Sequence, residues 1–139
     1  MSHAYSEDQL VEQPAIGLFE DLGWETVSAA EEVFGVSGTW GRTTKMEAVL
    51  SGRLRAALEK LNPTLPPEAV TSAIDELTRN RSAMSMTAAN REVHELLKQG
   101  IKVSVPDRER GGQKTGRVRV FAWQNPAAND FLLVSQMSI

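Results

Sequence analysis

The last third of the chain alternates apolar and polar residues in the manner of β-strands. Three segments show a strand pattern: residues 101–105, 117–123 and 131–137. Ile101, Val103 and Val105 occupy alternate positions, which predicts a strand with one buried and one solvated face. Residues 131–134 are continuously apolar, which is typical of a strand that is buried on both faces and has a neighbour on each side. We expect three strands in succession, with one neighbour of the third encoded beyond residue 139.

The first part of the chain predicts a helix with an apolar stripe. A capping pattern at Ser6 begins the helix, and Gly23 ends it. The stripe, which we expect to be buried, consists of Leu10, Pro14, Leu18 and Leu22. Pro14 lacks an amide hydrogen, which predicts a kink or a late start of the helix. A short strand over residues 24–27 and a glycine-containing loop over residues 37–42 follow.

Three further helices precede the strands. The second helix follows a capping pattern at Thr44 and ends before Pro63, and the third begins at residues 65–68. The fourth covers residues 87–99 and ends at Gly100. Their apolar stripes are Met46, Leu50, Leu54, Leu58 and Leu61; Val70, Ala73, Ile74 and Leu77; and Ala89, Val93, Leu96 and Leu97. Because such helices need an apolar sheet face, we predict an α/β (α+β) fold with N-terminal helices packed on a small mixed or antiparallel sheet.

Length and composition exclude several classes of protein. A chain of 139 residues predicts a single domain over residues 1–139. The sequence contains no apolar run that could span a bilayer and no export signal, so we expect a cytoplasmic protein with no membrane partner. Cysteine is absent and the only imidazoles are His3 and His94, which argues against thiolate chemistry and a transition-metal site. A catalytic metal would have to be a hard ion on carboxylates, such as magnesium.

The turn between the first two predicted strands is rich in cations. Because the net charge is −3, a nucleic-acid-binding surface has to be a local patch. The candidates are Arg108, Arg110, Lys114, Arg117 and Arg119, of which the last two share one face of their predicted strand. Such a cluster can bind phosphates without reading bases. A solvated hairpin tip, with its charge partly balanced by Asp107 and Glu109, explains the same residues, and both interpretations stay open.

Other candidate residues have simpler structural explanations. The sequence contains no nucleophile elbow, and residues 111–115 lack the first glycine and the following helix of a phosphate loop. His94 has no second imidazole near it in its predicted helix, which favours a surface histidine. The arginines near the helix ends suggest ion pairs along helix faces, namely Asp75 with Arg79 and Arg91 with Glu95.

Several contiguous segments of the sequence resemble those of a known protein family. They are residues 6–15, 53–63 with 65–69, 77–82, 89–93 and 129–136. Together they resemble the amino-terminal region of the R (restriction) subunit of type I restriction enzymes, in order and over nearly the entire chain. The resemblance implies a parent protein with an N-terminal nuclease of the P-D…(D/E)-x-K superfamily, an ATP-driven translocase, and a part that joins the methyltransferase and specificity subunits. Magnesium and ATP are implied for that parent, and no cofactor for this chain.

The chain departs from the family pattern at the catalytic motifs. The P-D and E-x-K elements would follow the last predicted strand, so we expect residues 1–139 to form an incomplete restriction-endonuclease-like core without these motifs or the translocase. Asp107 follows Pro106, but no apolar strand with E-x-K comes after it, and we reject it as the active aspartate. Some nucleases of this superfamily use a first-helix glutamate near the metal. Glu12 matches that role by location, and we assign no metal ligand.

Two function hypotheses follow. In the first, the chain is the N-terminal part of a nuclease for magnesium-dependent, ATP-linked cleavage of unmodified DNA, and is inactive alone. In the second, it is a non-catalytic module that binds DNA or the modification subunits. A DNA-binding assay at increasing salt discriminates between the possibilities. The affinity of a phosphate-binding surface for DNA falls steeply with salt, whereas a protein-docking surface need show no affinity for DNA.

Overall fold

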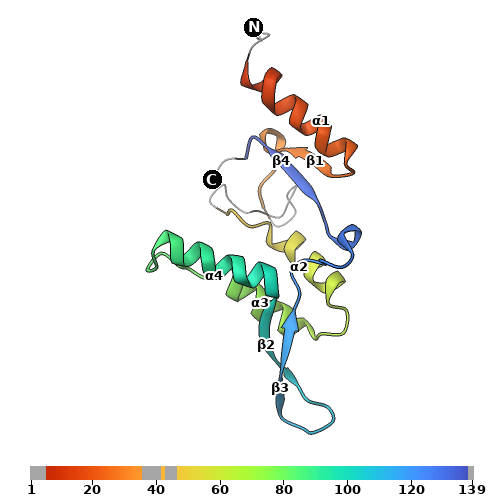
Figure 1. Cartoon of the computed structure of the whole chain (residues 1–139), viewed down its shortest axis with the longest axis vertical. Helices are drawn as coiled ribbons and strands as arrows, with labels where there is room; N and C mark the ends of the chain where they lie inside the picture. Colours follow the sequence, from red (N-terminus) through yellow and green to blue (C-terminus); the bar gives the residue numbers. More distant parts are fainter. Residues whose placement is uncertain (1–5, 36–41, 43–46, 138–139) are drawn as a thin grey trace. The chain divides into compact units, whose positions relative to one another are not determined.

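The computed structural model describes residues 6–35, 42 and 47–137. The helices are a π-helical turn (Asp8–Glu12), α1 (Gln13–Asp21), α2 (Ser51–Leu61), α3 (Pro67–Thr78) and α4 (Met86–Gln99). The strands are β1 (Glu25–Ser28), β2 (Ile101–Pro106), β3 (Gln113–Val118) and β4 (Leu132–Ser135) (Figure 1). Short 3₁₀ turns occupy Ala29–Glu31 and Pro126–Ala128. A parallel pair, β1–β4, and an antiparallel pair, β2–β3, accompany the helices, which confirms the predicted α/β class.

The chain divides into two compact units. Unit 1 comprises residues 1–48 and 130–139, and unit 2 comprises residues 49–129. That both belong to one domain over residues 1–139 stays a prediction.

Unit 1 pairs the first strand with the last. β1 and β4 run parallel, with Glu25 opposite Leu132 and Ser28 opposite Ser135. The Trp24 ring lies near those of Phe19 and Phe131, at centroid distances of 4.7 and 4.9 Å. Aromatic pairs at this separation contribute about 0.5–1.5 kcal/mol beyond their buried area. These rings therefore join α1 to the strand pair.

The first helix forms, but its leucine stripe is exposed. The amide of Gln9 donates to Ser6 Oγ at 3.3 Å, as the capping pattern predicts. The α-helix proper starts only at Gln13, after the π-helical turn, which agrees with the late start expected from Pro14. The predicted burial of Leu10, Pro14, Leu18 and Leu22 is wrong: the three leucines are 56–65% exposed. Phe19, one position further round the helix, contacts Trp24 instead.

β4 is shorter and less buried than predicted. It spans Leu132–Ser135 and all four residues are half-buried, so the strand is not buried on both faces. Within the described part of the chain, β1 is its only paired neighbour. The predicted succession of three strands in one sheet is therefore wrong, since β2 pairs with β3 and β4 pairs with β1.

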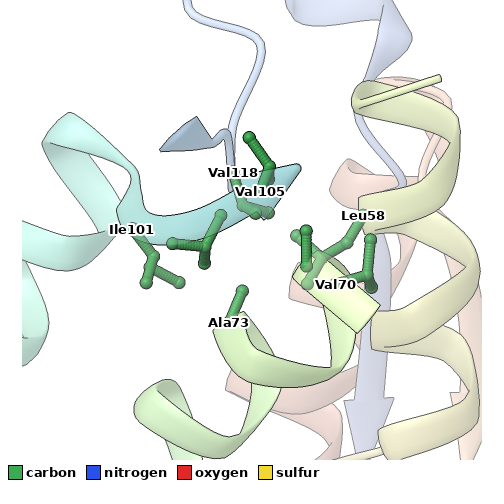
Figure 2. Packing of buried hydrophobic residues seen from close by; sticks show 8 residues of the cluster. Leu58, Val70, Ala73, Ile101, Val105 and Val118 are labelled. Atoms are coloured by element: carbon green, nitrogen blue, oxygen red, sulfur yellow. The ribbon is translucent and has the colours of Figure 1, made fainter. Parts of the chain in front are cut away.

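Unit 2 is organised around an apolar core between α2, α3 and the β2–β3 hairpin. Figure 2 shows Ile101, Val105 and Val118 of the hairpin facing Leu58 of α2 and Val70 and Ala73 of α3. Ala69 and Val103 complete the buried cluster. The side chains of β2 alternate between buried and exposed along the strand, as its sequence pattern predicts. Fully burying an aliphatic side chain of this kind contributes about 1.5–3 kcal/mol.

The helix ends in unit 2 follow local signals, with one exception. Pro67 is the first residue of α3, where a missing amide hydrogen costs nothing, and Gly100 ends α4 with a φ of +82°. Ser85 caps α4 because its Oγ accepts the Ala88 amide at 3.1 Å. The exception is α2, which begins at Ser51. The predicted start at Thr44, the stripe residue Met46 and most of the predicted loop at 37–42 lie outside the described residues.

The strand predicted over residues 117–123 is displaced. β3 ends at Val118, and the backbone beyond it is paired by two asparagine side chains instead of a strand. Asn62 accepts the Arg119 amide at 2.8 Å and donates to the Arg119 carbonyl at 2.9 Å. Asn129 accepts the Ala122 amide at 2.8 Å and donates to the Ala122 carbonyl at 3.3 Å. Arg119 therefore does not share a strand face with Arg117.

Candidate functional site

The cations of the predicted cluster fall into two groups. Arg108 and Lys114 line an open groove of about 620 Å³ at the hairpin tip, beside Pro66 and Pro67. Arg117 and Arg119 line a different depression, of about 260 Å³, beside the end of α4. Lys114 and Arg117 lie roughly 10 Å apart along β3 and on opposite faces, because successive strand residues alternate. All five cations, including Arg110, are exposed.

Asp107 organises the hairpin tip. Its Oδ1 accepts the backbone amides of Arg110 and Glu109 at 3.1 and 3.0 Å. These hydrogen bonds, above all that from the Arg110 amide, hold the pKa of the Asp107 carboxyl below its usual value. Gly111 and Gly112 have φ values of +75° and +70°, which glycine adopts without strain. The carboxylate rejected as a catalytic aspartate thus has a structural role in the turn.

Arg117 and Trp123 bind the last carbonyls of α4. Arg117 Nη1 donates to the carbonyl of Gln99 at 2.6 Å, and Trp123 Nε1 donates to that of Lys98 at 3.1 Å. A cation at a helix C-terminus is favourable because these carbonyls have no partner within the helix. A Cβ at Gly100 would lie 2.8 Å from the Val118 carbonyl, so the backbone approaches closely here. The Arg117 head is therefore held in place by the end of α4.

Two aromatic residues accompany this second group. Phe121 and Trp123 have ring centroids 5.2 Å apart and are 37% and 63% exposed. Together with Lys98 they line the same depression as Arg117 and Arg119. In the strand predicted over residues 117–123, both rings occupy the alternate positions that also hold Arg117 and Arg119. That position was the signal that would have found them.

The arginines at the end of α3 join α3 to α4. Arg79 pairs with Glu76 at 3.1 Å and with Glu92 of α4, not with Asp75 as predicted. Glu95 accepts Gln99 Nε2 at 2.8 Å, so the predicted pair with Arg91 is also wrong. The Arg81 guanidinium, 8% exposed, lies 3.4 Å from the Glu92 carboxylate and also donates to two carbonyls at the end of α3. Helix-face spacing missed the pairs with Glu92 because Glu92 comes from a different helix.

The Glu92 carboxylate should make unit 2 sensitive to acid. Hydrogen bonding to Arg79, and secondarily its charge, holds the pKa of Glu92 below the ordinary value of 4.5. The pair therefore contributes stability above pH 4.5, and that stability is lost as the pH falls through the lower, folded-state pKa. We expect Glu92→Gln to flatten the acid side of a plot of unfolding midpoint against pH. Glu59→Gln, which alters an exposed pair with Arg55, should leave the plot unchanged, and an equal effect of both substitutions would contradict the assignment.

Glu12 lies at the end of the π-helical turn and contacts the residue that follows β4. Both of its carboxylate oxygens accept Gln136 Nε2, at 2.7 and 2.8 Å. Gln136 has a φ of +58°, an uncommon conformation for a residue other than glycine. Among residues 6–35, 42 and 47–137, no three His, Cys, Asp or Glu side chains gather closely enough to hold a metal ion. The described residues therefore do not fit a magnesium site by themselves, although Glu12 is one carboxylate of the kind that such a site uses.

Comparison with known proteins identifies the family. Residues 4–139 match the family described as the type I restriction enzyme R protein N terminus. The chain is 29% identical over 129 residues to the type I restriction enzyme HindI endonuclease subunit of Haemophilus influenzae, covering 93% of this chain and 12% of that protein. It is 25% identical over 134 residues to a protein of Methanocaldococcus jannaschii, provisionally named the MjaIXP type I restriction enzyme endonuclease subunit, covering 96% and 12%.

Solved structures and membrane-spanning segments give no further assignment. No solved structure matches the chain significantly. No helix within the described ranges is long and apolar enough to cross a membrane. The family match extends over nearly the whole chain, from the helix that carries Glu12 to the strand that precedes Gln136. The chain therefore belongs to the family of type I restriction enzyme R protein N-terminal regions.

Proposed function

We propose that the chain is the amino-terminal part of the nuclease of a type I restriction R subunit and contributes to magnesium-dependent, ATP-linked cleavage of unmodified DNA. The family match and two relatives named as endonuclease subunits support this proposal. The chain spans 12% of the length of each relative. Magnesium, ATP, the methyltransferase and specificity subunits, and a cytoplasmic location therefore belong to the proposed whole protein.

The contact between Glu12 and Gln136 carries the proposal for the nuclease site. The family pattern puts the P-D and E-x-K elements after the last strand, and Gln136 directly follows β4. Gln136 holds the Glu12 carboxylate at that point through both oxygens. Glu12 would thus stand beside the start of the segment that supplies the other carboxylates and the lysine. No catalytic step is assigned to the described residues themselves.

The proposal predicts that the chain alone does not cut DNA. We expect no loss of supercoiled plasmid when the chain is incubated with plasmid and magnesium, because the described residues do not form a metal site. Specific cleavage that Glu12→Ala abolishes would overturn this expectation, since the catalytic centre would then lie within residues 1–139.

A chimeric R subunit tests the role of Glu12 directly. Residues 1–139 would replace the matching segment of the Haemophilus influenzae relative, and cleavage and ATP hydrolysis would be measured in the assembled enzyme. We expect Glu12→Gln to lower cleavage by about 10–100-fold, the range for a residue that supports a metal site, with ATP hydrolysis unchanged. Glu7→Gln, an exposed carboxylate one turn earlier, is the control. Equal cleavage by the two variants would remove Glu12 from the site.

Non-catalytic DNA binding is the second candidate function. It is favoured by the exposed cations on the hairpin tip, where the Asp107 carboxylate accepts the Glu109 and Arg110 amides and so stabilises the turn. Arg108→Ala with Arg110→Ala should weaken duplex binding and lower the salt slope by about 2, one unit per phosphate contact. Lys60→Ala with Arg91→Ala removes the same charge from α2 and α4 and serves as control. No affinity for DNA at low salt would instead favour a protein-docking surface.

A further inference from the structure

Phe121 and Trp123 present aromatic surface that no contact in unit 2 covers fully. Trp123 is 63% exposed, yet its Nε1 is bound to the Lys98 carbonyl, which fixes the orientation of the ring. Phe121 packs against it at an interplanar angle of 51°. With His94, Leu97 and Lys98 the two rings also line an apolar depression. The result is an aromatic face that is solvated and oriented before any ligand arrives.

The same rings lie within a cationic surface. The depression that they share with Lys98, Arg117 and Arg119 has no acidic side chain among the described residues that line it. Arg117 uses one N–H for the Gln99 carbonyl, and its guanidinium has further donors. A surface of apolar rings flanked by positive charges is poorly suited to pack against an apolar polypeptide segment. Burying the three cations against such a segment would cost free energy.

We propose that this aromatic–cationic surface, formed by Lys98, Arg117, Arg119, Phe121 and Trp123, binds unpaired nucleotides of DNA. Exposed rings stack on nucleobases regardless of sequence, while neighbouring cations contact the phosphates. In an intact duplex the bases are already stacked on each other, so the rings would have no base face to contact. The inference rests on DNA as the partner in the proposed function and goes beyond it, because it specifies the strand state that is bound and the residues that distinguish it.

Three DNA ligands test the proposal with the whole chain. Fluorescence anisotropy at a series of salt concentrations would compare, at each one, an oligothymidylate of about 15 nucleotides, an abasic oligonucleotide of equal length and a duplex of equal length. We expect the oligothymidylate to bind about tenfold more tightly than the abasic strand. Trp123→Leu should remove about this factor, while Trp123→Phe should retain most of it. Both variants lose the bond to the Lys98 carbonyl, so their difference isolates the aromatic ring.

The outcomes separate bases, phosphates and protein partners. Arg117→Ala with Arg119→Ala should weaken the oligothymidylate and the abasic strand by the same factor. Equal affinity for these two strands, a preference for the duplex, or identical binding by the Leu and Phe variants would each overturn stacking. If stacking is overturned in this way, an affinity for the duplex that falls steeply with rising salt would mean that the surface binds DNA through phosphates alone. No binding to any of the three DNAs would overturn the proposal and favour an apolar polypeptide on this face. The comparison of Glu12→Gln with Glu7→Gln in the chimera changes no residue of this surface, so the two proposals can fail separately.

Discussion

Leu58→Ala is expected to lower the free energy of unfolding of unit 2 by about 3 kcal/mol. Leu58 is fully buried and is the residue through which α2 enters the core, where it faces α3 and the β2–β3 hairpin (Figure 2). Replacing its isobutyl group by a methyl group leaves a cavity that two helices and a hairpin cannot close completely. Urea denaturation followed by circular dichroism would measure the change, since three of the four α-helices among the described residues lie in this unit.

A leucine-sized apolar residue on the surface provides the matched control. Met86, the first residue of α4, is 82% exposed, and Met86→Ala should change the free energy of unfolding by less than about 0.5 kcal/mol. A loss below about 1 kcal/mol for Leu58→Ala would show that the core tolerates a cavity of this size, contrary to close packing.

Asn62→Ala is expected to cost about 3 kcal/mol as well. Asn62 is 7% exposed, and its amide donates to the carbonyls of Leu58 and Arg119 while its oxygen accepts the Arg119 amide. Truncation removes three hydrogen bonds, one buried and two part-buried, and a hydrogen bond of this kind contributes about 0.5–1.5 kcal/mol. Asn90→Ala, an exposed asparagine on α4, should be neutral or slightly stabilising because alanine favours helix.

Asn62→Asp tests whether Asn62 stabilises unit 2 through its hydrogen bonds. The carboxylate keeps an acceptor for the Arg119 amide but turns a negative charge toward two carbonyl oxygens. We therefore expect this variant to be at least as unstable as Asn62→Ala at neutral pH and to recover as the pH falls, because the protonated carboxyl can donate again. Urea midpoints for both variants from pH 4 to pH 8 would show the difference. Parallel curves for the two variants would mean that Asn62 acts by packing alone.

The elements predicted well are those whose signals are local. α3 and α4 follow capping and proline signals within one turn of their ends, and β2 shows its buried face in its own alternation. β3 was displaced because its end depends on Asn62, which lies 57 residues before Arg119. β4 appeared central because residues 131–134 are continuously apolar, whereas its pairing partner, β1, lies more than 100 residues away in the sequence. No window of local pattern contains either relation.

The candidate site was predicted in composition but not in arrangement. The five cations are close in sequence, but strand alternation and the end of β3 at Val118 divide them between the tip and the end of α4. Lys98 joins the second group from a helix, which spacing within the hairpin could not indicate. For Glu12 the family resemblance supplied the candidate, while its partner Gln136, 124 residues away, could be identified only from the structure.

The parallel β1–β4 pair also constrains the order in which parts of the polypeptide fold during translation. Residues 25–28 cannot meet 132–135 until the latter leave the ribosome, whereas all core residues of 49–129 are already available by then. Closing so long an excursion costs conformational entropy, and prior folding of the intervening segment reduces the length of flexible chain that must be closed. Until that late step, the backbone edge of residues 25–28 that pairs with 132–135 has no strand partner and is open to other polypeptides.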